Sequence, residues 1–202
     1  MGFLPPNDRP LKHAQKNLID WFQKNRRNLP WRPRDIHAKR DPYAVWISET
    51  MLQQTQVITV IPRFLEWMQV LPTLQHLASA DDSLVLRLWQ GLGYYSRVKS
   101  LHRAAQILTE QGYVSLPPDA HILHSLPGIG AYTTGAILSL AFHRQAPILD
   151  GNLIRIFSRL YEWQHLPSES AQWKKRYWQE ASQWIQGAPA YLVNESLMEL
   201  GA

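Results

Sequence analysis

The sequence predicts an all-α fold, and three observations lead to it. Apolar residues recur at spacings of three and four along the chain, which is the periodicity of helices with one buried face. Aspartates stand where helices are expected to begin, and prolines stand where they are expected to end. No two segments alternate apolar and polar residues around a short turn, so no β-hairpin is expected. We therefore expect roughly ten short helices.

The expected helices follow one another between clear start and stop signals. Asp41 precedes Pro42, which places a capping side chain before a first-turn proline. Asp82, Asp119 and Asp150 also stand at expected helix starts, and prolines at 72, 117, 118 and 167 mark breaks. A further amphipathic helix is expected to carry the tryptophans at 173, 178 and 184. The remaining expected helices cover 11–22, 43–57, 62–70, 84–88, 101–108, 132–142 and 153–160.

Composition limits the class of protein. Hydrophobic residues make up 45% of the 202 residues and charged residues 18%, which is typical of a globular chain. The net charge of +5 is compatible with a polyanionic partner, although ordinary surface charge explains it equally well. The absence of cysteine excludes disulfides and thiolate metal ligands in these residues. No signal-peptide pattern opens the sequence, so we expect a cytoplasmic protein.

A glycine-rich turn joins two of the expected helices. Its residues are Leu126, Pro127, Gly128, Ile129 and Gly130. Glycines two apart permit a tight turn and close approach to another surface, and the next helix then points its first amides outward. Such amides bind phosphate without reading sequence. The segment can be an ordinary turn, but in a basic all-α chain it predicts a helix-hairpin-helix motif.

Asp150 follows this hairpin by twenty residues, in the segment Leu149-Asp150-Gly151-Asn152. An aspartate that opens a helix is commonly an N-cap. Glu49 lies in a helix rich in valine, isoleucine and methionine, where an exposed turn position is the favoured interpretation. From these residues alone, both carboxylates can be structural.

Six segments together resemble one family, the MutY-type adenine DNA glycosylases of the helix-hairpin-helix superfamily, in matching order over nearly the whole chain. The combination of SETMLQQT with GLGYY is the most specific part. The segments are NLPWR at 28–32, VWISETMLQQTQV at 45–57, WQGLGYYSR at 89–97, LPGIGAYT at 126–133, LDGN at 149–152 and NESLMELGA at 194–202.

The resemblance implies a role for each matching residue. Glu49 matches the general acid, which protonates adenine at N7 so that the base can leave. Asp150 matches the carboxylate that stabilises the sugar cation, and Tyr132 matches the residue that supports this aspartate. Asn152 matches a polar neighbour of the reacting sugar. The implied substrate-binding residues are Trp31, Arg32 and Glu195 around the adenine, and Gln53, Gln54 and Tyr94, of which the last two enter the base stack.

Three other functions remain open. An endonuclease III-like glycosylase would carry a lysine for a Schiff base where this chain has Tyr132. A thymine-mismatch glycosylase keeps the tyrosine and the aspartate, but Glu49 favours adenine. A non-catalytic helix-hairpin-helix DNA-binding protein needs the hairpin, but not Glu49 and Asp150 together.

The resemblance also implies an architecture and partners. We expect two helical lobes with a DNA-binding cleft between them: a hairpin lobe over 43–150, and a second lobe made of 1–42 and 151–202. The partner is duplex DNA with an adenine mispaired with 8-oxoguanine or guanine, bound by a monomer. The family usually carries a [4Fe–4S] cluster and an 8-oxoguanine-recognition domain in segments after the position of Ala202, so neither is expected in these residues. The hairpin carbonyls are expected to hold a monovalent cation.

Overall fold

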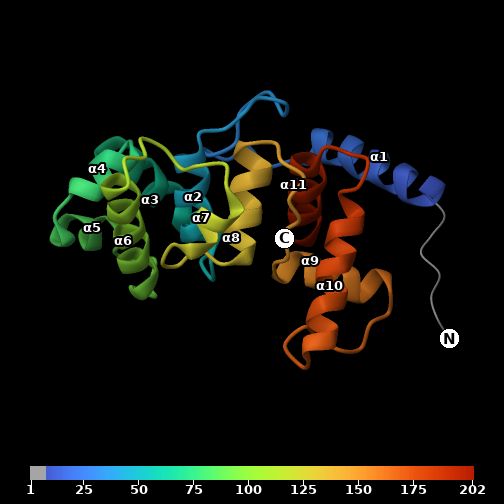
Figure 1. The fold of residues 1–202 in the computed structure, drawn as a ribbon. Coiled ribbons are helices and arrows are strands. Elements are labelled where there is room, and N and C mark those ends of the chain that lie inside the picture. Colours follow the sequence, from blue (N-terminus) through green and yellow to red (C-terminus); the bar gives the residue numbers. More distant parts are fainter. Residues whose placement is uncertain (1–7) are drawn as a thin grey trace. The chain divides into compact units, whose positions relative to one another are not determined.

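The computed structural model describes residues 8–202, and this part of the chain is helical with no strand (Figure 1). The predicted all-α class is confirmed. The chain divides into two compact units. The first contains residues 8–27 and 143–202 of the described chain, and the second contains Asn28–Phe142. No helix in the described residues is both long enough and apolar enough to cross a membrane.

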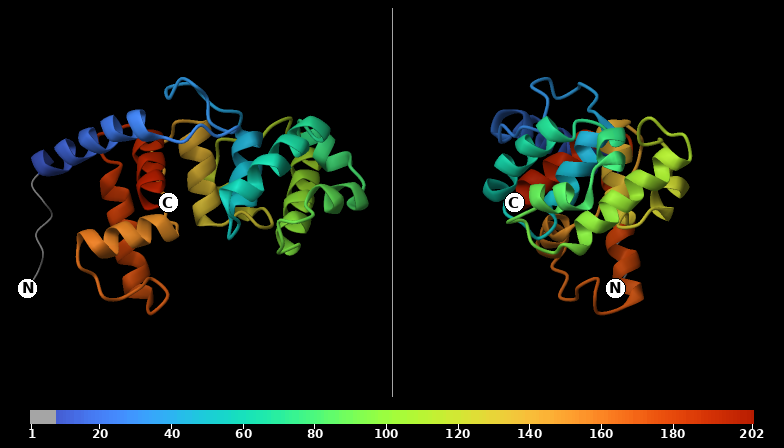
Figure 2. Two further views of the ribbon diagram at one scale, coloured as in Figure 1. Left: turned by 180° about the vertical axis from the view of Figure 1, so that it is seen from behind. Right: turned by 90° about the vertical axis from the view of Figure 1, so that its left-hand side faces the viewer.

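The second unit is built around large aromatic side chains. Trp46, Trp67 and Trp89 are almost completely buried, and the rings of Trp67 and Trp89 meet edge to face at 5.8 Å. Helix α2 packs against α3 and α8, while α6 packs against α4 and α5 (Figure 2). The helices of this unit are α2 (Pro42–Leu52), α3 (Val57–Val70), α4 (Leu74–Ser79), α5 (Asp82–Leu88), α6 (Ser96–Glu110), α7 (Ala120–Ser125) and α8 (Ala131–Ala136), which continues into a π-helical turn, η1 (Ile137–Ala141).

The first unit has four helices in the described residues: α1 (Asp8–Asn25), α9 (Gly151–Leu160), α10 (Ala171–Trp184) and α11 (Ala190–Gly201). Helix α11 contacts both α1 and α9, and α10 contacts α9. The buried amide of Gln15 on α1 donates hydrogen bonds to the carbonyls of Trp184 and Gln186, at 2.8 and 2.9 Å. These bonds fix α1 to the end of α10, so residues far apart in sequence form one core.

The prediction of one helix over 43–57 was wrong beyond Leu52. Helix α2 ends there, and Gln54 adopts a left-handed conformation with φ of 57° that no α-helix accommodates. The next helix begins at Val57, five residues before Pro62, where the expected one began. Apolar periodicity continues through this break because residues on both sides of it face the same core. Periodicity alone therefore could not show the turn.

The unit boundaries also differ from the expected lobes. Leu29 and Trp31 lie in the second unit because both are buried there, and Trp31 packs edge-on against Phe64 at 5.3 Å. The segment from 143 to 150 lies in the first unit, where the buried side chain of Asn194 donates a 2.9 Å hydrogen bond to the carbonyl of Ala146. Asp150 therefore lies within the first unit, eight residues after its boundary at Phe142.

Candidate functional site

The buried side chain of Glu49 and the half-buried side chain of Tyr132 form a hydrogen-bonded pair in the second unit. Glu49 lies in the last turns of α2 and only 4% of it is exposed. The hydroxyl of Tyr132, near the start of α8, donates a hydrogen bond to Oε2 of Glu49. Buried carboxylates need such partners, because an unpaired one loses its hydration without compensation. Glu49 is therefore held by α8 and is not the exposed turn residue that its position alone suggested.

Local structure explains why Glu49 points inward. Asp41 caps α2 by accepting a hydrogen bond from the amide of Tyr43 at 3.0 Å, which fixes where the helix begins. Ser48 and Thr50, on either side of Glu49, turn their hydroxyls back to their own helix, to the carbonyls of Val45 and Trp46. The neighbours of Glu49 in sequence thus satisfy their own polar groups and leave its carboxylate to Tyr132.

Asp150 and Asn152 form a second polar pair, in the first unit. One carboxylate oxygen of Asp150 accepts a hydrogen bond from the amide of Leu153 at 2.9 Å and caps α9. The other oxygen accepts from the side-chain amide of Asn152 at 3.0 Å. Burial raises the pKa of Asp150 above 3.8, and the hydrogen bonds from Leu153 and Asn152 oppose that shift. One side chain therefore both caps α9 and holds the side-chain amide of Asn152.

Helix α11 holds Asn152 from behind. A Cβ on Gly201 would lie 2.6 Å from the Cβ of Asn152, so only glycine fits at this contact. The guanidinium of Arg155 donates a 2.5 Å hydrogen bond to the carbonyl of Gly201 and ties α9 to the end of α11. Glu195, on the same helix, is buried with 4% of its surface exposed. The start of α9 is thus fixed by close packing as well as by its cap.

The predicted hairpin has the geometry that its sequence required. Leu126 and Ile129 are buried, and the amide of Ile129 donates a 3.2 Å hydrogen bond to the carbonyl of Leu126. Gly128 adopts a φ of +77°, and a Cβ there would lie 2.8 Å from the Cβ of Ser100 on α6. Gly130 is the N-cap of α8 and has no side chain with which to cap the first amides of that helix. Pro127 completes the turn and is half-buried.

Two loops of the second unit present exposed side chains in left-handed conformations. Gln54 is exposed with a φ of 57°, and Tyr94 is 62% exposed with a φ of 46°. Such conformations are unusual for residues other than glycine, and they concentrate at functional sites. The neighbouring Gln53 points the other way, and its side-chain amide donates a 3.4 Å hydrogen bond to the hydroxyl of Thr133 on α8.

The structure brings the predicted residues together in part. Glu49 contacts Tyr132, and Asp150 contacts Asn152, whereas Asp150 and Tyr132 belong to different units. The support of Asp150 by Tyr132 therefore stays a prediction. Trp31 and Arg32 lie in the second unit, buried and half-buried, and their contact with adenine also stays a prediction.

Sequence analysis gave no role to Arg97, which the structure places between the two exposed loops. Its guanidinium donates hydrogen bonds to the residues around Gln53 and around Gly93. The arginine stands three residues after Tyr94 in the quoted segment WQGLGYYSR. An arginine three residues after an aromatic residue in a glycine-rich segment was the feature of the sequence that could have indicated a role for Arg97.

Among the side chains that the structure describes, at residues 11–202, no three histidine, aspartate or glutamate residues gather as a potential metal site. The sequence has no cysteine, so its residues cannot hold a [4Fe–4S] cluster by thiolates.

Comparison with known proteins identifies relatives over most of the chain. Residues 47–180 match the HhH-GPD superfamily base excision DNA repair protein family. The adenine DNA glycosylase of Rattus norvegicus is 43% identical over 192 residues, which are 93% of this chain and 37% of that protein. The adenine DNA glycosylase of Homo sapiens is 43% identical over 190 residues, which are 92% of this chain and 35% of that protein. The chain thus spans little more than a third of the length of these relatives.

Solved structures with the same fold are more distant in sequence. A thermostable thymine-DNA glycosylase superposes with a TM-score of 0.81 at 23% identity, covering 96% of this chain and 87% of its own. A trapped covalent intermediate of endonuclease III with DNA superposes with a TM-score of 0.71 at 15% identity, covering 96% of this chain and 85% of that one. These likenesses support the fold.

Proposed function

The chain belongs to the HhH-GPD superfamily of base excision DNA repair proteins, and we propose from this that it is the catalytic region of an adenine DNA glycosylase. It would hydrolyse the N-glycosidic bond of adenine mispaired with 8-oxoguanine or guanine in duplex DNA and leave an abasic site. We propose that it acts as a monomer at the nucleoid. The hydrogen bond between Tyr132 and the buried Glu49 is the observation that carries this proposal.

Glu49 would protonate the leaving base. Adenine leaves poorly as an anion, so a positioned carboxylic acid lowers the barrier to bond cleavage. Tyr132 donates a hydrogen bond to Oε2 of Glu49 and would help to hold the carboxyl group in position for proton transfer to the base.

Asp150 would stabilise the positive charge that develops on the sugar as the bond lengthens. Both of its oxygens are held, one by the Leu153 amide and one by Asn152, so the carboxylate is oriented before substrate binds. Two carboxylates in different environments can divide acid and electrostatic roles in this way. The raised pKa of Asp150 means that its ionised form is lost at a higher pH than for an ordinary aspartate.

Base extrusion would use the two exposed loops. The adenine has to leave the stack before Glu49 can reach it, at a cost of a few kcal/mol that a mispaired base lowers. Gln54 and Tyr94 are exposed and would fill the vacated position. Trp31, Arg32 and Glu195 would line the pocket for the extruded adenine.

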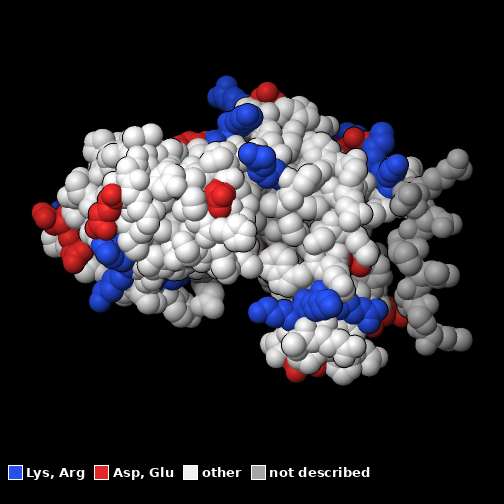
Figure 3. Space-filling view, in the orientation of Figure 1, with Lys and Arg blue, Asp and Glu red and all other residues white. Residues whose placement is uncertain are grey.

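The hairpin and the basic surface would hold the DNA backbone. The first amides of α8 would contact phosphate, and the hairpin carbonyls, as hard oxygen ligands, would suit a monovalent cation beside it. In Figure 3, Lys and Arg side chains gather across α10, the helix that carries Lys174, Lys175 and Arg176. These cations would add sequence-independent attraction to the duplex.

The proposal is tested by the base that the chain releases and by the state of the strand. Duplexes with adenine opposite 8-oxoguanine or guanine should lose adenine, and duplexes with a thymine mismatch should lose none. The product should remain uncut until alkali is added, because the phenol of Tyr132 cannot form a Schiff base. Release of thymine would support the alternative of a thymine-mismatch glycosylase. Strand cutting coupled to base release would support an endonuclease III-like lyase. Binding of DNA without release of any base would support a non-catalytic DNA-binding protein.

A further inference from the structure

Arg97 holds the end of the helix that carries Glu49. It is the second residue of α6, and its Nη1 donates hydrogen bonds to the carbonyls of Thr50 and Met51 on α2, at 2.8 and 3.3 Å. Nη1 also donates to the carbonyl of Gln53 at 2.5 Å. The last carbonyls of a helix have no partner within it, and a cation is favoured there. The guanidinium thus fixes the chain from directly after Glu49 to the first glutamine of the loop.

The second terminal nitrogen of Arg97 reaches the other loop. Nη2 donates to the carbonyls of Leu92 and Gly93 at 2.9 and 3.3 Å, and to the hydroxyl of Thr55 at 3.3 Å. Thr55 in turn donates to the carbonyl of Leu92 at 3.2 Å. A planar guanidinium presents donors in a rigid fork, which an ammonium group cannot reproduce. One side chain therefore ties both loops together.

Each of the two loops tied by Arg97 carries one residue in a left-handed conformation. Gln54 lies between Gln53 and Thr55, and Tyr94 follows Gly93, so each left-handed residue is next to an acceptor of Arg97. The guanidinium carbon also lies 5.4 Å from the centroid of the Tyr94 ring. Left-handed conformations of such residues persist only where the surroundings enforce them. Arg97 contacts the ring of Tyr94 and hydrogen-bonds to both sequence neighbours of Gln54, which are Gln53 and Thr55.

We propose that Arg97 is a positioning residue for base extrusion, which holds Gln54 and Tyr94 in their exposed conformations before DNA binds. This inference rests on the proposed function. Because both loops are ordered in advance, the extrusion step does not include the entropic cost of ordering them. Small displacements of positioned groups also have large effects on rate. Arg97 contacts neither Glu49 nor Tyr132, so its effect passes through the loops and the end of α2.

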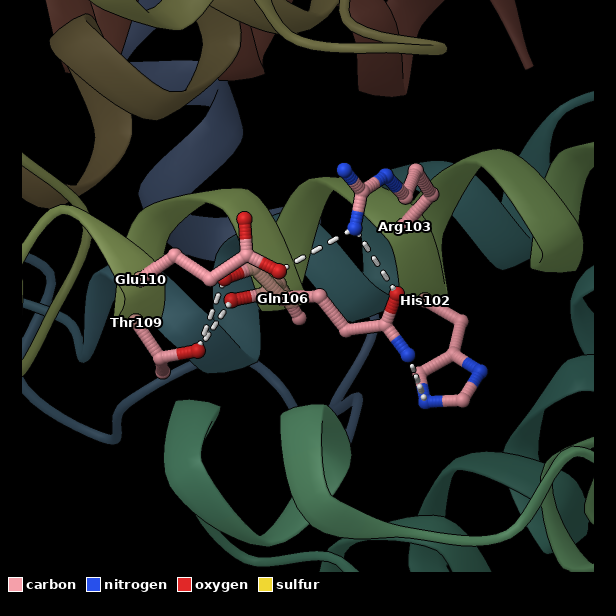
Figure 4. A network of polar contacts seen from close by, with 6 residues as sticks. His102, Arg103, Gln106, Thr109 and Glu110 are labelled. Carbon is pink, nitrogen blue, oxygen red and sulfur yellow. Dashed lines mark hydrogen bonds and ion pairs between the residues drawn. The ribbon is translucent and has the colours of Figure 1, made fainter.

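The test compares Arg97→Lys with Arg103→Lys on the same helix. Arg103 is exposed, and its Nη1 donates to Gln106 and Glu110 on the surface of α6, at 3.3 and 3.2 Å (Figure 4). Both substitutions keep the charge and the aliphatic stem but lose the fork. Arg103→Lys should behave as the parent in every measurement.

Three measurements separate positioning from general stability. Single-turnover adenine release from an adenine–8-oxoguanine duplex should fall about 100-fold in Arg97→Lys. The fluorescence rise of a 2-aminopurine next to the target adenine, which reports unstacking, should weaken. Equilibrium binding should change by less than about threefold, since phosphate contacts dominate affinity. In DNA-free protein, amide hydrogen exchange over 53–55 and 92–94 should become about tenfold faster.

The exchange measurement distinguishes the two proposals. If the parent chain releases no adenine, the proposed function fails. Faster amide exchange in both loops of Arg97→Lys would still show that Arg97 holds the two loops. If Arg97→Lys does not fold, Thr55→Val decides, because it removes one acceptor of Arg97 and should speed exchange in both loops by a smaller factor. Parental exchange in both loops in the folded variant would overturn the role of Arg97, and so would parental release in an active chain.

Discussion

The hydroxyl of Tyr132 donates a hydrogen bond to a carboxylate oxygen of Glu49, across 83 residues of sequence. Tyr132 is the second residue of α8, directly after the hairpin, while Glu49 lies on α2. The element expected to hold a DNA phosphate and the expected general acid are therefore joined by one side chain. We therefore expect a change in the position of the hairpin to alter the position of the acid.

Tyr132→Phe should slow adenine release about 10- to 100-fold, because it removes one hydrogen bond to an ionisable group, worth about 1.5–3 kcal/mol. The ring remains, so binding to duplex DNA should change little. Single-turnover kinetics measure the rate. Tyr113→Phe, which changes a tyrosine after α6 with no hydrogen bond of its hydroxyl among the described residues, is the control. Equal rates for the two variants would contradict the role of the pair.

Asp150→Asn should stabilise the protein at neutral pH. Burial raises the folded-state pKa of Asp150 above 3.8, so folding favours the protonated form. The contribution of this carboxyl to stability is fully present below the unfolded-state pKa and is lost as pH rises through the raised folded-state pKa. Asparagine stays neutral and also caps helices. Urea unfolding at pH 7 and near pH 4 should show a gain that shrinks at the lower pH.

Asp119→Asn should change the stability of the protein in the opposite direction to Asp150→Asn. Asp119 is an exposed cap of α7, and the hydrogen bond from the amide of Ile122 lowers its pKa below 3.8. Its contribution is therefore present at neutral pH and is lost as pH falls through the folded-state pKa, so the asparagine variant should be less stable at pH 7. The same direction of change in both variants would show that burial of Asp150 does not control its titration.

Gly128→Ala should destabilise the protein more than Gly112→Ala. Both glycines have positive φ, +77° and +84°, so each alanine has a similar backbone penalty of about 1–2 kcal/mol. At Gly112 the added Cβ meets open space, whereas at Gly128 it lies 2.8 Å from the Cβ of Ser100. The clash should add about 1–3 kcal/mol. Thermal unfolding measures both, and Ser100→Gly should recover part of the Gly128→Ala loss.

Binding to duplex DNA should weaken steeply with salt. If about six phosphates are contacted, the logarithm of the binding constant should fall with the logarithm of salt with a slope of about −5. Replacing Lys174 and Lys175 on α10 by glutamine should make the slope shallower by up to about 2. Titrations between low and physiological salt measure this. A slope that those two substitutions leave unchanged would place the contacts elsewhere, and no slope at all would contradict a phosphate interface.

Local chemistry made much of the fold predictable. Asp41, Asp119 and Asp150 all cap helices through their side chains, as their positions before apolar segments predicted. The expected start at Asp82 is also observed, although the cap position falls on Asp81 and makes no side-chain hydrogen bond. The hairpin was predictable because only glycine, at position 128, accepts the positive φ and the close contact with Ser100 found there. These features depend on few neighbours along the chain.

The remaining features depend on contacts distant in sequence. The end of α2 at Leu52 is held by Arg97, 45 positions later, and no local signal marks it. Glu49 was identified through its resemblance to a family, because its own neighbours are compatible with an exposed position. Its partner Tyr132 could be assigned only from the structure, since the hydrogen bond joins two helices that the sequence alone does not bring together.

The central claim is that Glu49 acts as the acid that releases adenine, and one measurement tests it most directly. Single-turnover adenine release from an adenine–8-oxoguanine duplex is compared between the parent chain and Glu49→Gln, with both proteins above their dissociation constants. Glutamine keeps the shape and the hydrogen bond from Tyr132 but cannot donate a carboxylic proton, so release should fall about 10²- to 10⁴-fold while binding is retained. Release by Glu49→Gln at the parental rate would contradict the account.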